Sequence, residues 1–216
     1  MGSNNQSDSQ NRRTFIDEAR RAQLIQCAID AIDEVGYKRA TLAEIAGHAG
    51  ITKGAIFYHF ANRDELMNAV FMHLVNAGGE FILAGVAAAE TPRDQLRAYV
   101  QSFIAALKVD PKAIRVLFVI MRNLADENHG REWSPEDYAL QETAIASLED
   151  ILRRGQEAGE FGEFDVRSMA LMIRGTTEMI PPFIEAYPGL DTEAYGRDLV
   201  LFFERACGVK RPRKPQ

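Results

Sequence analysis

The sequence predicts an all-α protein with a small N-terminal helical domain followed by a larger helical bundle. Apolar residues recur at intervals of three and four along most of the chain, and glycines and prolines separate these amphipathic segments. No segment shows the strict alternation that is typical of a β-strand. The 216 residues, 46% hydrophobic and 26% charged, have an ordinary globular composition. We therefore expect about nine helices.

The N-terminal part is expected to hold three closely spaced helices. Residues 1–16 are interpreted as a disordered arm, because their first eleven positions are rich in Asn, Gln and Ser. A first amphipathic helix follows and should stop at Gly36. Thr41 begins a T-x-x-E capping box for a short second helix. Gly50 should end this helix, and Thr52 should cap a third helix that reaches about His59.

The remaining helices are expected to form the second domain. A long fourth helix should start after Asn62 and break or bend near residues 78–79, where two glycines stand together. Further helices are expected over residues 93–108, 112–125, 136–159, 165–187 and 192–208. The pair Pro181-Pro182 should kink or end the helix that contains it. The expected domains are residues 17–63 and 64–208, followed by a flexible basic tail at 209–216.

Charge is distributed unevenly between these two parts. Residues 1–63 carry 8 Lys and Arg against 7 Asp and Glu, a net +1, whereas the rest carries 17 against 24, a net −7. An acidic body repels duplex phosphates, so any DNA contact should be local to the N-terminal part. This argues against a non-specific nucleoid protein, although chance accounts for the asymmetry about equally well.

Compartment and membrane signals point to the cytoplasm. The polar N-terminus lacks the apolar stretch of a secretory signal, and we expect no membrane span because no run of about 18 apolar residues is free of charge. Cys27 and Cys207 both lie in apolar helical patterns, as expected for buried thiols in a reducing compartment.

The segment from Thr41 to Phe60 is typical of a helix-turn-helix. Two short capped helices are separated by a tight turn, and the second must protrude to enter a major groove about 12 Å wide. Gly50 can adopt the positive φ that the turn requires, and Ile51 can lock the two helices together. The alternative interpretation of such a segment is a plain helical hairpin.

This segment resembles the signature of the TetR family of transcriptional regulators. The resemblance rests on Thr41-Leu42-Ala43-Glu44-Ile45-Ala46, on Gly50-Ile51, and on Thr52-Lys53-Gly54-Ala55-Ile56-Phe57-Tyr58-His59-Phe60 with Arg63 and Leu66. It covers about residues 19–66, and the later helices agree only in number and length. It implies a homodimer that binds a palindromic operator in double-stranded DNA, with the last two helices pairing across the dimer.

The resemblance also implies the residues that contact DNA. These are Thr41, Thr52, Lys53, Gly54, Ala55, Tyr58, His59 and Arg63. Arg63 stands where the family usually has a phosphate-binding Lys, and its guanidinium can serve the same purpose. Phe57 departs from the pattern, because the family usually has a Tyr whose hydroxyl reaches a phosphate. Phe57 and Phe60 are expected to be core residues.

The bundle is expected to bind a small, largely apolar or aromatic effector of unknown identity. The candidate ligand-binding residues are Phe103, Leu107, Phe118, Met121, Arg122, Met172, Thr176, Met179 and Phe183. The candidate dimer residues are Met169, Ile173, Ile180, Ile184, Tyr195, Leu199, Phe202 and Phe203. For any one of these residues, an ordinary core position is the alternative.

No motif for catalysis or for a cofactor is evident. Asp126, Glu127 and His129 lack a second His or a Cys nearby, so no metal site is expected, and no nucleophile–base pairing argues for an enzyme. The sequence therefore predicts a ligand-responsive regulator, most simply a repressor that its effector releases from DNA. The alternative is a helical small-molecule-binding protein or enzyme with a vestigial helix-turn-helix.

Overall fold

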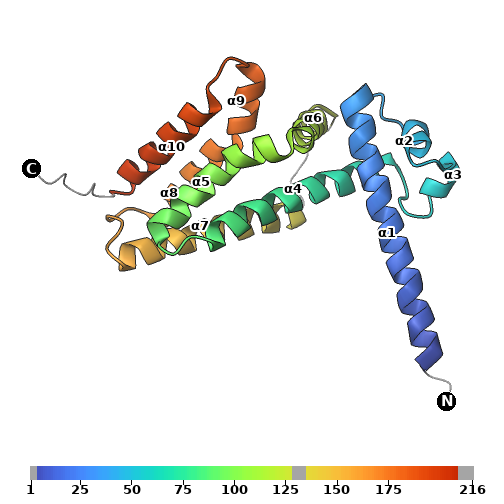
Figure 1. Cartoon of the computed structure of the whole chain (residues 1–216), viewed down its shortest axis with the longest axis horizontal. Helices are drawn as coiled ribbons and strands as arrows, with labels where there is room; N and C mark the ends of the chain where they lie inside the picture. The colour runs from blue at the N-terminus through green and yellow to red at the C-terminus, as the bar shows by residue number, and fades with distance from the viewer. Residues whose placement is uncertain (1–3, 128–134, 209–216) are drawn as a thin grey trace, which may run out of the picture. The chain divides into compact units, whose positions relative to one another are not determined.

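The computed structural model describes residues 4–127 and 135–208, and these residues are helical with short connections (Figure 1). The expectation of an all-α chain with an N-terminal helix-turn-helix and a C-terminal helical domain is confirmed. The described part contains α1 (Asn4–Val35), α2 (Leu42–His48), α3 (Lys53–Ile56), α4 (Arg63–Ala87), α5 (Pro92–Val109), α6 (Pro111–Glu127), α7 (Pro135–Glu157), α8 (Val166–Glu178), α9 (Ile180–Ala186) and α10 (Thr192–Ala206).

Two helical features differ from expectation and a third agrees with it. Helix α1 already begins at Asn4, so residues 4–16 are helical instead of disordered as expected. No Gly or Pro interrupts the chain between there and Val35, and extending an existing helix is far easier than nucleating one. Helix α4 continues through residues 78–79 without a break. The predicted helix over 165–187 is split at Met179 into α8 and α9, as the following Pro181-Pro182 led us to expect.

The described residues form two compact units, whose composition departs from the expected domain boundary at residues 63 and 64. One unit comprises residues 4–76 and 112–127, and the other comprises 77–111 and 135–208. Helix α6 therefore belongs with the helix-turn-helix. The reason is burial: Val116 and Ile120 of α6 lie in the same apolar core as α1–α4. Two ion pairs add to this packing, Lys112 with Asp30 and Arg115 with Asp33.

The core of the first unit is built from one face of each of its helices. The side chains at its centre are fully covered, and they include Leu24, Ile45, Ile56, Phe60 and Leu66. Removing such side chains from water contributes about 1.5–3 kcal/mol each. Because α2 and α3 bury apolar residues on one side only, their other side remains open to solvent.

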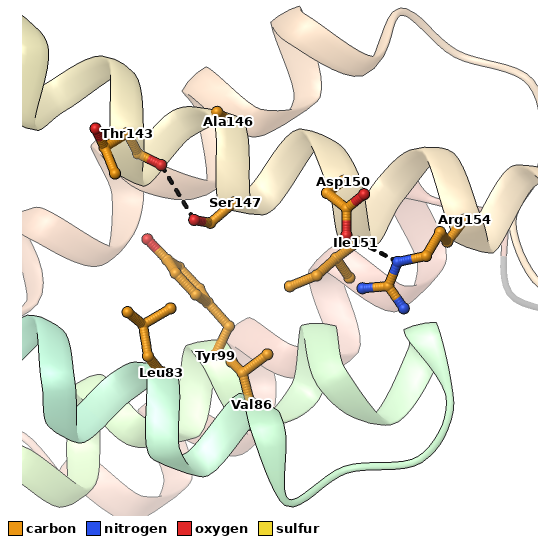
Figure 2. Close-up of a pocket in the computed structure, with 9 residues that line it drawn as sticks. All are labelled: Leu83, Val86, Tyr99, Thr143, Ala146, Ser147, Asp150, Ile151 and Arg154. Atoms are coloured by element: carbon orange, nitrogen blue, oxygen red, sulfur yellow. Dashed lines mark hydrogen bonds and ion pairs between the residues drawn. The ribbon is translucent and has the colours of Figure 1, made fainter.

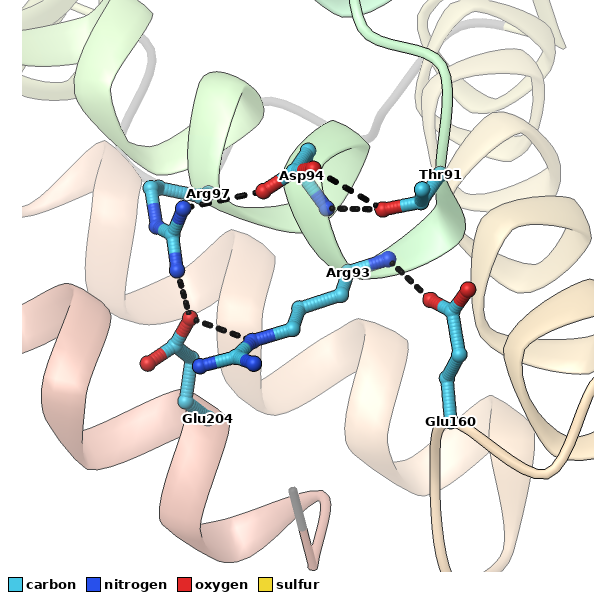
Figure 3. A network of polar contacts seen from close by, with 6 residues as sticks. All are labelled: Thr91, Arg93, Asp94, Arg97, Glu160 and Glu204. Atoms are coloured by element: carbon cyan, nitrogen blue, oxygen red, sulfur yellow. Dashed lines mark hydrogen bonds and ion pairs between the residues drawn. The ribbon is translucent and has the colours of Figure 1, made fainter. Parts of the chain in front are cut away.

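The second unit packs α5 against α7 and α10, and α7 against α8. Its core includes Leu96, Leu148, Leu152, Ile173 and Phe203. A polar network also joins α5 to α10 and to the connection after α7 (Figure 3). Its members are Glu204, which contacts both Arg93 and Arg97, and Glu160, which accepts from the backbone N–H of Arg93 at 2.9 Å.

Helix α4 is long and apolar enough to cross a membrane by length and composition alone. We expected no membrane span, because no apolar run of about 18 residues is free of charge. In α4 the charged residue Glu80 interrupts the apolar run, but the mean hydropathy of the helix stays within the range of membrane spans. Four of its residues, Leu66, Met67, Val70 and Leu74, lie in the core of the first unit. One such helix is weak evidence for a membrane span.

Candidate functional site

The turn between α2 and α3 has the geometry that the helix-turn-helix interpretation requires. The Thr41 hydroxyl accepts a hydrogen bond from the backbone N–H of Glu44 at 3.2 Å, which caps α2. After α2, Gly50 has φ +64°, a left-handed conformation that favours glycine. The backbone N–H of Ile51 then donates to the Ala46 carbonyl at 3.0 Å and closes the turn. The expected Thr41 cap and Gly50 turn are both present.

Helix α3 is shorter than expected, since its α-helical part covers only Lys53–Ile56. The chain continues to Phe60 in tighter turns, in which Phe57 and His59 donate to carbonyls three residues back. Ile56 and Phe60 are buried and hold this segment against the core. Phe57 is 50% exposed and Tyr58 is 90% exposed, so the expectation that Phe57 belongs to the core is wrong. Its neighbour Ile56, one position earlier, occupies the inward direction.

Most of the predicted DNA-contacting residues lie on the outer side of this segment. Exposed positions are Thr41, Thr52, Lys53, Gly54 and Tyr58, while Ala55 and His59 are half-buried. The exposed Thr52 side chain makes no capping hydrogen bond to α3, so its hydroxyl is not used to cap the helix. A cation, hydroxyls and a phenol ring are therefore presented together, a set that can contact phosphates and base edges.

Gly54 has no structural requirement within the described part of this chain. It is exposed, its φ is not in the left-handed region, and a Cβ built on it would meet only Thr52 Oγ1, at 3.8 Å. A glycine inside a helix costs about 0.5–1 kcal/mol relative to alanine. The packing of the described residues does not account for that cost.

Arg21 holds the α3 segment in place, although it was not among the residues expected at the site. Arg21 stacks its guanidinium 4.0 Å from the centre of the Phe60 ring, donates to the His59 carbonyl, and pairs with Glu65 at 3.2 Å. Hydrogen bonds from the Ala61 N–H and from Arg21 lower the pKa of Glu65. Sequence reasoning missed Arg21, because its partners lie about 40 positions away.

The resemblance implies that Arg63 contacts a DNA phosphate. In the structure, the Arg63 side chain already makes several contacts within the protein. Its Nε donates to the Ala40 carbonyl at 3.1 Å, its Nη2 donates to the Tyr37 carbonyl, and its guanidinium lies 4.4 Å from the centre of the Tyr37 ring. The side chain therefore ties the start of α4 to the connection before α2. Any contact it makes with a phosphate must use the remaining N–H groups of the fork.

Comparison with known proteins places this geometry in a family. Residues 24–70 match the family described as "Bacterial regulatory proteins, tetR family", and residues 89–181 match "Tetracyclin repressor-like, C-terminal domain". The chain belongs to the TetR family. The two matches cover the helix-turn-helix and most of α5–α8, so the assignment rests on both units of the structure.

Curated relatives and solved structures of similar shape agree with this assignment. An HTH-type transcriptional regulator BetI from Stenotrophomonas maltophilia is 35% identical over 102 residues, which are 47% of this chain and 52% of that protein. BetI from Yersinia pestis is 30% identical over 125 residues, 57% of this chain and 60% of that protein. The chain thus spans about half to three fifths of these relatives. The regulator FadR from Bacillus halodurans shares the fold with a TM-score of 0.69 and 22% identity, over 85% of this chain and 94% of that one.

In this TetR-family protein the second unit contains an open cleft between α7 on one side and α4 and α5 on the other (Figure 2). Its volume is about 570 Å³, within the usual range for small-molecule sites. The lining residues are Leu83, Val86, Tyr99, Thr143, Ala146, Ser147, Asp150, Ile151 and Arg154. The sequence contains one pattern that relates to this cleft. Its four polar α7 residues recur at intervals of four, three and four, which places them on one helix face, but a solvent-exposed helix face shows the same pattern.

None of the nine predicted ligand-binding residues lines this cleft. Phe118, Met121 and Arg122 belong to the first unit, whereas Phe103, Leu107, Met172, Thr176, Met179 and Phe183 belong to the second. Met121, Met172, Met179 and Phe183 are exposed rather than interior. Leu148, Ile151 and Leu152 of α7, beside the cleft, are buried. His129, considered as a metal ligand, lies outside the described residues.

The predicted dimer residues differ in their burial within the single chain. Met169, Ile173, Ile180, Leu199 and Phe203 are buried in the core of their own chain, and Ile184 and Tyr195 pack partly against the same core. Phe202 alone of the eight is largely exposed, at 62%. The apolar residues that α8 and α9 expose are instead Leu171, Met172, Met179 and Phe183. Helix α8 carries apolar residues on two faces, so the sequence pattern does not show which of the two faces is buried in the core.

Proposed function

We propose that this protein is a homodimeric, ligand-responsive transcriptional repressor of the cytoplasm that binds a palindromic operator in double-stranded DNA. The observation that carries the proposal is the exposed outer side of the α3 segment, with Lys53 and Tyr58 projecting and Gly54 leaving the backbone bare. The residues that anchor this segment, Ile56 and Phe60, are fully buried, so it is held rigidly while its outer side faces solvent. This is the arrangement that a recognition helix requires.

A second copy of the chain accounts for the apolar residues that α8–α10 leave in water. Leu171, Met172 and Phe202 are all close to half exposed or more. Large exposed apolar residues on neighbouring elements indicate an interaction surface. A palindromic operator requires two recognition segments related by a two-fold axis, which a symmetric dimer supplies.

Response to an effector follows from how the chain joins the two units. Helix α4 contributes residues 63–76 to the first unit and 77–87 to the second, and α6 follows α5 directly after Asp110 but belongs to the first unit. An effector bound in the second unit can therefore bias the first through the covalent connections within α4 and between α5 and α6. By thermodynamic linkage, an effector that weakens operator binding is itself bound more weakly on DNA by the same factor.

Fluorescence anisotropy with a labelled palindromic duplex from beside the protein's own gene tests the proposal. We expect Lys53→Ala to weaken binding and to reduce the salt slope by about one, because one phosphate contact is lost. Tyr58→Ala should weaken binding at every salt concentration. Matched controls are Lys108→Ala and Tyr187→Ala, which remove an exposed Lys and an exposed Tyr from the second unit.

Two results would count against the repressor. Wild-type protein that binds the palindrome no more tightly than unrelated duplex would exclude sequence-specific recognition. Variants of Lys53 and Tyr58 that behave like their controls, while folding normally, would favour the alternative of a small-molecule-binding protein or enzyme with a vestigial helix-turn-helix. The family assignment and the regulator names of the relatives do not favour that alternative.

A further inference from the structure

The cleft of the second unit contains a buried hydroxyl group without a partner. Tyr99 of α5 is 6% exposed, and its hydroxyl forms no hydrogen bond within the described part of the chain. Burial raises the pKa of Tyr99. The side chains of Arg174 and Thr177 lie close enough to lower it in part, but neither is in hydrogen-bonding geometry with the hydroxyl, so the phenol keeps its proton at neutral pH. A buried polar group that lacks a partner destabilises the fold, and such groups are rare in native proteins.

The other hydroxyl groups of the cleft have already used their hydrogens. Thr143 donates to the Ala139 carbonyl at 2.8 Å, and Ser147 donates to the Thr143 carbonyl at 3.1 Å. Figure 2 shows the Tyr99 ring crossing the cleft with its hydroxyl directed toward α7. Of the three hydroxyls that line the cleft, Tyr99 therefore provides the unused donor.

The charges at the cleft cancel one another. Only Asp150 and Arg154 among the lining residues are ionised, and Arg154 Nε pairs with Asp150 Oδ2 at 2.8 Å. The Nη2 of Arg154 donates to Gln95 at 2.8 Å. A charged molecule entering the cleft would lose hydration and meet only charges that are already paired, because Arg174 near Tyr99 also forms an ion pair, with Glu178. The remaining lining is largely aliphatic, from Leu83, Val86, Ala146 and Ile151.

We propose that this cleft binds a neutral effector with an apolar body and one carbonyl oxygen, and that the oxygen accepts a hydrogen bond from Tyr99. This inference rests on the proposed function, because it names the chemical class of the effector. The Tyr99 hydroxyl is buried, so a ligand in the cleft reaches it only when a neighbouring side chain moves. Leu83 lines the same cleft and is 53% exposed, so its side chain can change rotamer with little loss of buried contact.

Calorimetric titration of the full-length protein with 2-nonanone tests the proposal, with nonanoate and nonylammonium as charged probes of equal length. We expect 2-nonanone to bind at least tenfold more tightly than either ion. Tyr99→Phe keeps the ring and removes the hydroxyl, and should weaken 2-nonanone binding about three- to tenfold. Tyr195→Phe is the matched control, because Tyr195 packs against the same core but does not line the cleft.

A purely structural role for Tyr99 makes a different prediction. If the hydroxyl stabilised the fold, Tyr99→Phe would lower the Tm, whereas an unpartnered hydroxyl predicts a Tm unchanged or about 2–4 °C higher. Ala146→Trp should abolish 2-nonanone binding by filling the cleft from an exposed position of α7. The proposal is overturned if 2-nonanone fails to bind, if either ion binds equally well, or if Tyr99→Phe and Ala146→Trp leave its affinity unchanged.

The titration contains no DNA, so its failure is distinguishable from failure of the proposed function. Protein that shifts its operator but does not bind 2-nonanone would refute the effector class alone. Protein that binds 2-nonanone with the expected Tyr99 dependence but recognises no operator would refute the regulator and leave a specific small-molecule site established.

Discussion

Replacing Gly54 with alanine separates the stability of the fold from its affinity for DNA. The added Cβ would lie 3.8 Å from Thr52 Oγ1, an ordinary van der Waals distance, and no other atom of the described residues is within 4 Å. The backbone there is helical, so alanine is compatible with it and restricts the unfolded chain. We therefore expect Gly54→Ala to raise the free energy of unfolding by about 0.4–1 kcal/mol.

Operator affinity should change in the opposite direction. If the α3 backbone approaches base edges closely, the new methyl group overlaps atoms of the DNA. Overpacking of this kind costs about 1–3 kcal/mol, which corresponds to roughly a 5- to 150-fold weaker Kd. Urea unfolding measures the first effect and fluorescence anisotropy with the operator duplex measures the second.

Gly47→Ala is the matched control for this prediction. Gly47 is also an exposed helical glycine of the first unit, near the C-terminal end of α2, and no described atom lies within 4 Å of the position that an added Cβ would take. It should gain similar stability and keep wild-type affinity. Gly54→Ala protein that binds its operator as tightly as wild type would refute the argument that this glycine serves a close approach to DNA.

Three further predictions concern Phe57, the exposed apolar residues of α8 and α10, and Glu204. Phe57→Tyr adds a hydroxyl at a half-exposed position, so operator affinity should rise about tenfold with an unchanged salt slope; equal or weaker binding would mean that no phosphate lies within reach. The double variant Leu171→Glu, Phe202→Glu should sediment as a folded monomer with weakened operator binding, whereas Val109→Glu, an exposed apolar residue of α5, should remain dimeric. Burial alone would raise the pKa of Glu204, but hydrogen bonds from two α5 arginines outweigh it and lower the pKa. This carboxylate therefore contributes stability above its unfolded pKa of about 4.3, and that contribution is lost as pH falls through the lower folded value. Glu204→Gln should cost about 1–2 kcal/mol at pH 7, less than for a fully buried pair because the arginines are about a third exposed, and the difference from wild type should shrink below pH 4; a constant difference would contradict the sign.

The local features of the helix-turn-helix could be predicted because neighbouring residues produce them. The Thr41 cap depends on an N–H three positions away, and the Gly50 turn depends on one backbone conformation. Both follow from residue type and short spacing. The exposure of Phe57 could not be predicted, because the tight turns after Ile56 rotate it outward relative to a regular helix.

The effector half could not be predicted in the same way. Its helices carry apolar residues on more than one face, so periodicity does not show whether Ile173 or Met172 points inward; the structure buries the first and exposes the second. The cleft residues come from α4, α5 and α7, and the hydroxyl of Tyr99 matters only because no hydrogen-bond partner among the described residues reaches it.

The sequence by itself determined the helical class, the helix-turn-helix and the family, because each depends on local patterns of apolar spacing, capping residues and turn glycines. Tertiary packing alone decided that α6 joins the unit that holds the helix-turn-helix, that Arg21 anchors the α3 segment while Arg63 ties α4 to the connection before α2, and that the Tyr99 hydroxyl finds no partner in the described part of the chain. The physical reason is range: capping and turn formation act between adjacent residues, whereas burial and hydrogen-bond satisfaction depend on residues that only the fold brings together.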